Sequence, residues 1–568
     1  MTQGKVLVFG DDTRSFLATV RTLGRHGIEV HAAPTRFISA ALRSRYIRQV
    51  HRLSPWLGDG AAWLAATAAL LRRERYDLVI PCTEIALLQL QAYRPVLAGL
   101  ARLALPDDPA IAVLFDKHAV RELARSLGVP VADGGLPQPG ETAAAILERY
   151  GAPLMIKPRR SFTLAEPDHR RTVQAVRDAA TLAPLLPALP PEDYLFESFF
   201  PGQGLGVSVL AGQGRVLQAF EHHRVREDEA GSYYRVSAPL TPALLAACEA
   251  ICGALSYTGL AMFEFRRDPA NGAWVLLEVN ARPWGSMPLP VGLGVEFPWF
   301  LYRLLVDGVA EPRRSYRAGV YARNLLPDLR GLTAEAQRRR ARGEPWVAPW
   351  LGGLAELRRW PLGQEVHDSL VGDDPTPGLV ELQQEARARG RWLGRRLPGG
   401  AALARLAARR RVMAALRGAA GRPVLFVCQG NICRSPFAEH ALRDLWRAAP
   451  AAPPVGSYGV LPRTARPTPA FGIAEAAAHA IDLTAHRSRY LAQDVAEGAA
   501  LLIVFDERNR RGVRALYPRL TTPLIKLGDL SDGQDIPDPF GAAQEKYAEV
   551  YRKILRGVQA LAALGAER

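Results

Sequence analysis

The feature that most constrains the fold of this chain is an apolar run that stops abruptly at a cysteine-containing loop. Residues 424–428 are VLFVC, and the next residues are QGNICRSP, after which a helical pattern begins. A β-strand that leads through a loop into a helix points several backbone N–H groups at one place, at the positive end of the helix dipole. The stretch therefore predicts an anion-binding loop at the carboxyl end of a buried strand.

Two side chains of this loop suit phosphate chemistry. The planar guanidinium of Arg434 can hold two phosphate oxygens, and the sulfur of Cys428 faces the same place. Backbone N–H groups and a nearby cation favour the thiolate, which is the nucleophilic form of cysteine. We expect Cys428 to attack a bound phosphorus atom. The leaving oxygen then needs an acid, and Asp538, in an acid-rich segment further along the chain, is the candidate.

Residues 423–568 resemble the low-molecular-weight protein tyrosine phosphatase family. The resemblance rests on the loop C-x-G-N-x-C-R-S and on a later Asp-Pro-aromatic motif, here Asp538-Pro539-Phe540. It implies Cys428 as the nucleophile, Arg434 as the phosphate clamp and Asp538 as the general acid. It also implies a group of residues that support the loop and the nucleophile: Asn431, Ser435 and His486.

Two further residues of this region match family positions. Asp506 falls on a family motif, and Cys433 matches a second loop cysteine that can trap the nucleophile as a disulfide under oxidant. Arsenate reductases that share the loop need further cysteines downstream, and the chain has none after Cys433, which excludes that activity. Only one aromatic residue, Phe540, follows Asp538, so the sequence does not decide between phosphotyrosine and a small phosphate ester.

Lysine is scarce, since only six of the 72 basic residues are lysines. A lysine retained in the first half of such a chain suggests a role for a compact ammonium group. Lys117 precedes a predicted helix, and Lys157 ends the apolar strand PLMIKP. Both can supply point charges for nucleotide phosphates.

A group of oxygen ligands follows on two predicted strands. Glu278 and Asn280 alternate along AWVLLEVN and therefore face one side of their strand. Together with Glu264 on GLAMFEFRRD they form an oxygen-only set that suits Mg²⁺, with Mn²⁺ as an alternative.

The order Lys, Lys, Glu, Glu-x-Asn-x-Arg resembles the ATP-grasp superfamily, and in particular its carboxylate–amine ligase-like members. The resemblance covers about residues 1–325 and includes Arg282 and the segment EHHRVRE. It implies ATP and Mg²⁺ as cofactors, and transfer of the γ-phosphoryl group to a substrate carboxylate, with attack by an amine or another nucleophile. It also implies that adenine binds at the hinge FESFFPG, which contains Glu197, Ser198 and Phe199.

These motifs predict an α/β multidomain protein with four regions. An N-terminal Rossmann-like domain (1–106) is followed by an α+β ATP-grasp domain (107–330). An Arg-rich helical connector (331–422) then leads to an α/β phosphatase domain with a parallel sheet (423–568). The leading hypothesis is a bifunctional enzyme that acts on a small-molecule carboxylate with a nucleophile and on a phosphate monoester. Two alternatives stay open: an ATP-binding module that regulates the phosphatase, and a signalling phosphatase that acts on phosphotyrosine of a protein.

Composition restricts the remaining possibilities. The net charge of +16 comes almost entirely from arginine, and without a nucleic-acid-binding motif it predicts a solvated surface. We therefore expect no nucleic-acid partner. Five scattered cysteines fit a reducing compartment, and the longest Ala-rich apolar stretch, 61–71, is half the length of a membrane span. We expect a cytoplasmic protein without a transmembrane segment; the oligomeric state is left open.

Overall fold

The structure is a computed structural model, and its contacts divide the chain into two compact units. The first unit comprises residues 1–53 and 64–382, and the second comprises 54–63 and 383–568. The predicted domain borders at 106, 330 and 422 stay predictions. Part of the predicted connector, residues 397–399 and the side chains of 391–396, lies outside the described residues. The structure describes residues 4–566 except for 36–38, 55, 57–58, 166, 168–169, 229–230, 397–399, 448, 450–451 and 518.

The N-terminal part of the first unit is a parallel sheet with the strand order β3-β2-β1-β4-β5. Its central strands are short apolar runs, and Val6 and Val8 of β1 pack on Phe16 and Leu17 of the first helix. Because the chain moves outward from β1 to β3 and then returns to β4, the sheet has its topological switch point between β1 and β4. The strands are β1 (Lys5–Phe9), β2 (Glu29–Ala33), β3 (Ile47–Val50), β4 (Leu78–Pro81) and β5 (Arg102–Leu103). The helices are α1 (Ser15–Arg25), η1 (Ala40–Arg43), α2 (Ala61–Glu74), α3 (Glu84–Ala92) and α4 (Arg94–Leu97).

A seven-stranded sheet, with the order β14-β13-β10-β11-β12-β15-β16, forms the larger part of the first unit. All neighbouring strands are antiparallel except β15 and β16. Alternate residues of its central strands, such as Val207 and Phe263, are buried against α9. The strands are β10 (Gln203–Gly212), β11 (Arg215–Asp228), β12 (Gly231–Ala238), β13 (Gly259–Arg267), β14 (Trp274–Asn280), β15 (Tyr321–Arg323) and β16 (Glu365–His367). The helices near it in sequence are α5 (Asp108–Leu114), α6 (Lys117–Ser126), α9 (Pro242–Ala254), α10 (Pro288–Gly292), α11 (Phe297–Tyr302) and η3 (Arg303–Asp307).

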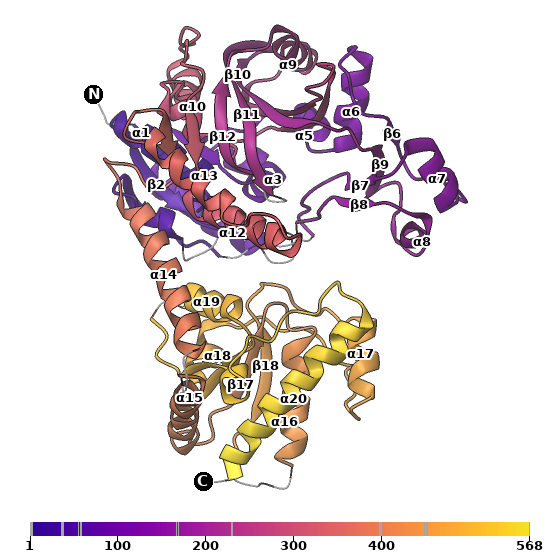
Figure 1. The fold of residues 1–568 in the computed structure, drawn as a ribbon. Coiled ribbons are helices and arrows are strands. Elements are labelled where there is room, and N and C mark those ends of the chain that lie inside the picture. The colour runs from indigo at the N-terminus through magenta and orange to yellow at the C-terminus, as the bar shows by residue number, and fades with distance from the viewer. Residues whose placement is uncertain are drawn as a thin grey trace. The chain divides into compact units, whose positions relative to one another are not determined.

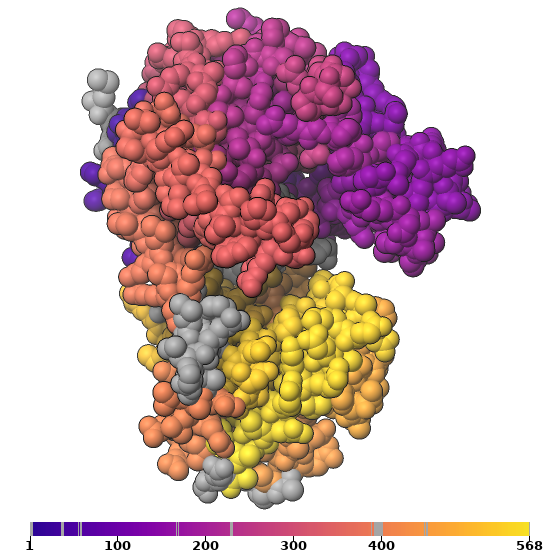
Figure 2. All heavy atoms as spheres, viewed as in Figure 1, coloured from indigo at the N-terminus to yellow at the C-terminus, as the bar shows by residue number. Residues whose placement is uncertain are grey.

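A small lobe stands out from the rest of the first unit, and the surface beside it is hollowed (Figure 1 and Figure 2). It contains an antiparallel sheet with the order β6-β9-β7-β8, whose apolar side packs on Ile146 and Leu182 of two short helices. Its elements are β6 (Gly134–Gly135), α7 (Ala143–Tyr150), β7 (Leu154–Pro158), β8 (Gln174–Val176), α8 (Ala179–Leu182), η2 (Leu186–Ala188) and β9 (Tyr194–Ser198).

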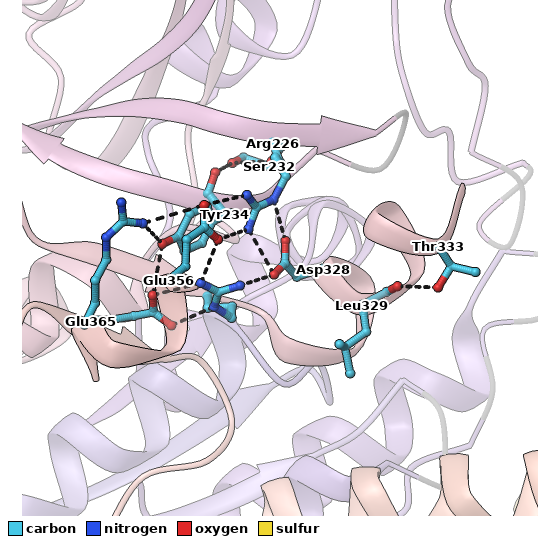
Figure 3. Close-up of polar contacts among 10 residues, drawn as sticks. Arg226, Ser232, Tyr234, Asp328, Leu329, Thr333, Glu356 and Glu365 are labelled. Atoms are coloured by element: carbon cyan, nitrogen blue, oxygen red, sulfur yellow. Dashed lines mark hydrogen bonds and ion pairs between the residues drawn. The ribbon is translucent and has the colours of Figure 1, made fainter. Parts of the chain in front are cut away.

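A buried ionic network joins the helices α12 (Leu325–Ala341) and α13 (Ala348–Glu356) to the seven-stranded sheet (Figure 3). Asp328 accepts from Nε of Arg226 at 2.7 Å and also pairs with Arg323. Arg226 holds Glu356 at 2.7 Å, so one arginine of β11 binds both helices. The ring centroid of Tyr234 lies 4.2 Å from the guanidinium carbon of Arg226 and 4.1 Å from that of Arg323. The remaining members of the network are Glu365 of β16 and Arg359 of the 3₁₀ turn η4 (Leu357–Arg359).

We expect Asp328→Asn to lower the free energy of unfolding of the first unit by about 3–5 kcal/mol, because the amide leaves buried guanidinium charge uncompensated. Asp328 has no exposed surface, and both of its oxygens face Arg226 or Arg323. Urea unfolding of the full chain, followed by circular dichroism, measures the effect. Glu335→Gln on the same helix is the control, because Glu335 forms only surface pairs with neighbouring arginines. Equal shifts for the two variants would contradict the prediction.

The second unit contains a four-stranded parallel sheet with the order β18-β17-β19-β20. All five residues of β17 are buried, as in a strand covered on both faces. Phe426 packs on one side with α20, whereas Leu425 and Val427 pack on the other side with α19. The strands are β17 (Val424–Cys428), β18 (Val455–Gly459), β19 (Leu501–Val504) and β20 (Leu524–Lys526). The helices are α14 (Thr376–Arg396), which begins in the first unit, α15 (Gly400–Arg417), α16 (Arg434–Leu445), α17 (Ala470–Ala477), α18 (Gln493–Gly498), α19 (Glu507–Leu516), η5 (Leu527–Leu530) and α20 (Gln544–Ala566).

The predicted fold class is confirmed. The chain combines a parallel N-terminal sheet, a mixed α+β region and a C-terminal parallel sheet. In the part of the chain that the structure describes, no helix combines the length and apolar character that crossing a membrane requires.

Candidate active sites

The loop after β17 surrounds the sulfur of Cys428 with donors. Cys428 ends the strand and is 3% exposed. Its Sγ accepts a hydrogen bond from the backbone N–H of Asn431 at 3.2 Å and one from the hydroxyl of Ser435 at 3.1 Å. Both donors stabilise negative charge on sulfur, and α16 begins one residue before Ser435. The loop thus brings one backbone and one side-chain donor to the sulfur of Cys428, the predicted nucleophile.

Asn431 holds the loop in shape. Its φ of +53° lies in the left-handed region, which Asn tolerates better than most residues. Its amide nitrogen donates to the hydroxyls of Ser435 at 2.9 Å and Ser457 at 2.8 Å, and its side-chain oxygen accepts from the backbone N–H of Arg489 at 2.7 Å. Its carbonyl oxygen lies 2.7 Å from Nε2 of His486. Burial lowers the pKa of His486, which favours a neutral ring that donates from Nε2.

Arg434 is held between two carboxylates. It is 1% exposed; Nη1 donates to Asp506 at 2.6 Å, and Nη2 donates to Asp538 at 2.7 Å. Asp506 also caps α19 by accepting from the backbone N–H of Asn509 at 2.6 Å, so its position is fixed. Asp538 is more exposed than Asp506 and lies on the loop before Phe540. The structure thus brings Asp538 to the phosphate clamp.

The second loop cysteine differs from the first. Cys433 is 2% exposed, and its Sγ lies 3.7 Å from the hydroxyl of Tyr547. Burial, with a smaller contribution from the carboxylate of Asp538, raises the pKa of Cys433 well above its usual range. Cys433 therefore keeps its proton, and of the two thiols Cys428 is the one whose surroundings suit a nucleophile.

Sequence reasoning missed a second layer beneath this loop. Ser457 of β18 donates to Glu439 of α16 at 2.5 Å, and Arg489 pairs with the same carboxylate at 3.3 Å. Together these three residues support Asn431. The motif Ser-Tyr-Gly around Ser457 was visible in the sequence, but nothing in it indicated the contact with Asn431.

The predicted metal ligands of the first unit lie together. Glu264 of β13 is opposite Glu278 of β14 in the antiparallel register. The amide nitrogen of Asn280 donates to Glu264 at 3.1 Å and to Glu278 at 3.3 Å. Its amide oxygen accepts from Arg282 at 3.2 Å. Two carboxylates and one amide oxygen fit Mg²⁺, provided that the amide turns its oxygen toward the carboxylates. In the described residues, no group of three or more His, Cys, Asp or Glu forms a metal cluster.

The two carboxylates have different electrostatic surroundings. Burial raises the pKa of Glu264, and its contact with Arg224 offsets this effect only in part. Burial also opposes ionisation of Glu278, but Lys117 and Lys157 outweigh it and lower the pKa. Glu278 is therefore the carboxylate that is readily ionised for a cation.

The two lysines lie on either side of the predicted nucleotide site. Lys117 begins α6, donates to the hydroxyl of Ser161 at 2.8 Å and lies 3.7 Å from Glu278. Lys157 of β7 is buried and pairs with Glu197 of β9, the neighbouring strand. Because Glu197 is engaged by Lys157, its carboxylate orients that lysine.

One cavity of about 620 Å³ connects these groups. It lies between the small lobe and the seven-stranded sheet, and residues of both line it. Every predicted cofactor or metal residue is on its wall: Lys117, Lys157, Glu197, Ser198, Phe199, Glu264, Glu278, Asn280 and Arg282. Residues of the N-terminal sheet also line it, and sequence reasoning did not place them there.

The second unit has the fold and the loop of a small cysteine phosphatase. A family model described as low molecular weight phosphotyrosine protein phosphatase matches residues 423–567. A probable low molecular weight protein-tyrosine-phosphatase, EpsP of Ralstonia solanacearum, is 31% identical over 139 residues, which are 24% of this chain and 92% of that protein. The phosphatase Etp of Escherichia coli K12 is 31% identical over 136 residues, 24% of this chain and 89% of that protein. Through residues 423–567, the chain belongs to the low-molecular-weight phosphotyrosine protein phosphatase family.

The first unit contains an ATP-grasp domain. A family model described as ATP-grasp in the biosynthetic pathway with Ter operon matches residues 191–325. Among solved structures, the biotin carboxylase domain of Hydrogenobacter thermophilus 2-oxoglutarate carboxylase, in complex with MgADP, has 18% identity and a TM-score of 0.45. The match covers 56% of this chain and 73% of that one. The chain thus combines a region that matches an ATP-grasp family model with a low-molecular-weight phosphatase domain.

Proposed function

We propose that the chain is a bifunctional enzyme, an ATP-dependent carboxylate–amine ligase joined to a cysteine-dependent phosphatase. The observation that supports it best is that two separate groups of residues each suit a different kind of phosphate chemistry. One has a sulfur nucleophile with an arginine clamp. The other has two lysines beside paired carboxylates. We infer that both act on substrates in solution.

In the phosphatase site, the sulfur of Cys428 attacks the phosphorus atom of a monoester. The S–P bond forms, the P–O bond to the leaving group breaks, and Asp538 protonates the leaving oxygen. Arg434 stabilises the transferring group. Because Asp538 pairs with Arg434 in the free chain, a phosphate that binds Arg434 competes with that pair and makes the carboxyl group available as an acid. Water then attacks the phosphorus atom of the phosphocysteine: a new P–O bond forms, the S–P bond breaks to return the thiolate of Cys428, Asp538 takes a proton from the water, and inorganic phosphate leaves.

The substrate of this site is a phosphate monoester of the phosphotyrosine class. The relatives that match over most of their length are named protein-tyrosine phosphatases. Phe540 is 51% exposed beside Asp538 and offers a face for a substrate ring.

In the ligase site, Lys117 and Lys157 bind the phosphates of ATP, and the hinge from Glu197 to Phe199 receives adenine. Glu264, Glu278 and Asn280 would hold Mg²⁺, which would neutralise phosphate charge. Arg282, which contacts Asn280, stabilises the negative charge of the substrate carboxylate as it accepts the γ-phosphoryl group. The acyl phosphate is then open to attack by an amine.

An ADP-release assay with the full-length Cys428→Ser variant tests the ligase proposal without interference from the phosphatase. Pools of carboxylates are combined with pools of amines in the presence of ATP and Mg²⁺. We expect ADP to form only when both pools are present, in a one-to-one ratio with an amide product measured by mass spectrometry. ATP binding without turnover in any combination would contradict the ligase and favour an ATP-binding regulatory module.

A further inference from the structure

The cavity that contains the ATP-site residues extends to the switch point of the N-terminal sheet. Strands β1 and β4 are parallel neighbours, with Phe9 opposite Pro81. The loops that follow them touch, since the hydroxyl of Ser15 lies 3.4 Å from the carbonyl oxygen of Cys82. In open α/β sheets, ligands bind outside the carboxyl ends of the strands at this point. Residues of both loops line the cavity together with the lysines and the paired carboxylates.

The loop after β1 brings Asp12 and Arg14 to the cavity, and the loop after β4 brings Glu84. The carboxylate of Asp12 accepts hydrogen bonds from its own loop and from the start of α1, whereas Arg14 and Glu84 are not engaged in this way. Arg14 follows β1 and is half-buried, with its guanidinium against the backbone of Gly285: a Cβ at residue 285 would lie 3.0 Å from Cζ of Arg14. Glu84 is the first residue of α3, after β4, and is also half-buried. Neither side chain has a hydrogen bond or an ion pair with any residue in the part of the chain that the structure describes.

The two charges have different neighbours. The strongest charged neighbour of Glu84 is Arg282, followed by Lys117 and Glu278, so Glu84 faces the reacting end of the cavity. Arg14 faces the Trp284–Gly285 segment instead. Arg14 has no side-chain partner among the described residues. Attraction to Arg282 and Lys117 offsets only part of the burial of Glu84, so neither charge is fully compensated for its lost hydration. A ligand that carries the opposite charges would supply that compensation.

We propose that these two loops bind the amine substrate of the ligase, and that this substrate is an α-amino acid bound as a zwitterion. Its carboxylate pairs with the planar fork of Arg14, and its ammonium group pairs with Glu84. The two side chains come from the loops that follow neighbouring parallel strands and line one cavity, so one small ligand can contact both. The proposal rests on the proposed ligase function and specifies its substrate class.

The arrangement assigns the amino acid to the role of nucleophile. A carboxylate held by Arg14 is neutralised by the guanidinium, so it is not the group that becomes phosphorylated. The ammonium end, in contrast, lies on the Arg282 side of the cavity. Burial raises the pKa of Glu84 and makes it a better proton acceptor.

The step balances without a further reactant. Glu84 takes one proton from the ammonium group, and the resulting amine attacks the acyl carbon. The C–N bond forms and the C–O bond to the phosphate breaks. The departing phosphate takes a second proton from nitrogen. The products are an amide, which retains the free carboxylate at Arg14, and inorganic phosphate.

A binding experiment on the full chain tests this site independently of turnover. Isothermal titration calorimetry, with a non-hydrolysable ATP analogue and Mg²⁺ present, measures each common L-α-amino acid. Each is compared with the amine that lacks its carboxylate and the acid that lacks its amino group. We expect at least one amino acid to bind about 10-fold or more tightly than both analogues, since each analogue loses one charge-assisted pair.

Two variants test which side chain binds each charged group of the amino acid. Arg14→Gln should remove the preference over the amine but keep the preference over the acid, and Glu84→Gln should do the reverse. Arg102→Gln and Glu122→Gln, exposed positions that do not line the cavity, are the controls. Binding of the ATP analogue shows that each variant is folded.

The outcomes separate this proposal from the ligase function. If no amino acid binds, or if Arg14→Gln and Glu84→Gln behave like the controls while the ATP analogue still binds, the amino-acid site is refuted. ADP release with amines that lack a carboxylate, unchanged in Arg14→Gln, would also refute it and leave the ligase function standing. Amino-acid binding with the expected variant pattern but without ADP release would support the site and contradict the ligase.

Discussion

The Cys428→Ser variant is expected to lose hydrolysis of p-nitrophenyl phosphate by more than about 10³-fold, because loss of the covalent nucleophile removes the whole pathway. The serine hydroxyl occupies nearly the same space, so the donors from Asn431 and Ser435 stay in place. They stabilise a thiolate but cannot ionise a hydroxyl to a useful extent. The variant should therefore still bind phosphate. Acid quenching should trap a labelled phosphoenzyme in the wild-type protein but none in the variant.

Cys433→Ser is the matched control for this prediction. It makes the same change in the same loop, but the thiol of Cys433 keeps its proton and contacts Tyr547 rather than the cradle. We expect this variant to retain most of the phosphatase activity, and both variants to bind ATP like wild type. Hydrolysis that persists in Cys428→Ser, or that falls equally in both variants, would remove Cys428 from the role of nucleophile.

The phosphatase loop could be predicted from the sequence because its chemistry is contiguous. Cys428, Asn431, Arg434 and Ser435 lie within eight positions, and a strand followed by a helix fixes their geometry. Asp538 was found because Asp-Pro-aromatic is itself a local pattern. The support from Ser457 could not be found in this way, because it depends on the parallel pairing of β18 with β17, which no local pattern encodes.

The residues of the predicted ligase site also fall into two groups: those that a local sequence pattern predicts and those whose position depends on the fold. The period of two along β14 places Glu278 and Asn280 on one face without knowledge of the fold. The positions of Arg14 and Glu84 depend on the strand order of the N-terminal sheet, since only the adjacency of β1 and β4 brings their loops to one cavity. Each residue alone is an ordinary charged residue near a helix start.

In the region 331–422, predicted as a helical connector, some of the secondary structure could not be predicted because its buried contacts are between charged residues. It contains the helices α12 to α15, but also β16, a three-residue strand that extends the seven-stranded sheet. The strand is held by Arg323, which donates to Glu365 at 2.6 Å. A segment whose buried contacts are ion pairs lacks the apolar periodicity by which strands and core helices are predicted.

For the ligase site, the variant with the largest expected effect is Glu278→Gln, and we expect it to reduce substrate-dependent ADP release by more than about 100-fold. Glu278 is the carboxylate whose pKa Lys117 and Lys157 lower, so at neutral pH it supplies the charge that holds a divalent cation. The neutral amide keeps the shape of the side chain but weakens that binding, and charge neutralisation by the metal contributes several kcal/mol to phosphoryl transfer. A higher Mg²⁺ concentration should restore part of the activity.

Glu249→Gln, an exposed position on α9, is the matched control and should behave like wild type. Phosphatase activity should be unchanged in both variants, because Cys428 and its donors belong to the other compact unit. If Glu278→Gln releases ADP at the wild-type rate and with the wild-type Mg²⁺ dependence, Glu278 is not a ligand of the metal. Loss of phosphatase activity in the same variant would show that the two active sites are coupled and that the chain is not simply two enzymes joined in one polypeptide.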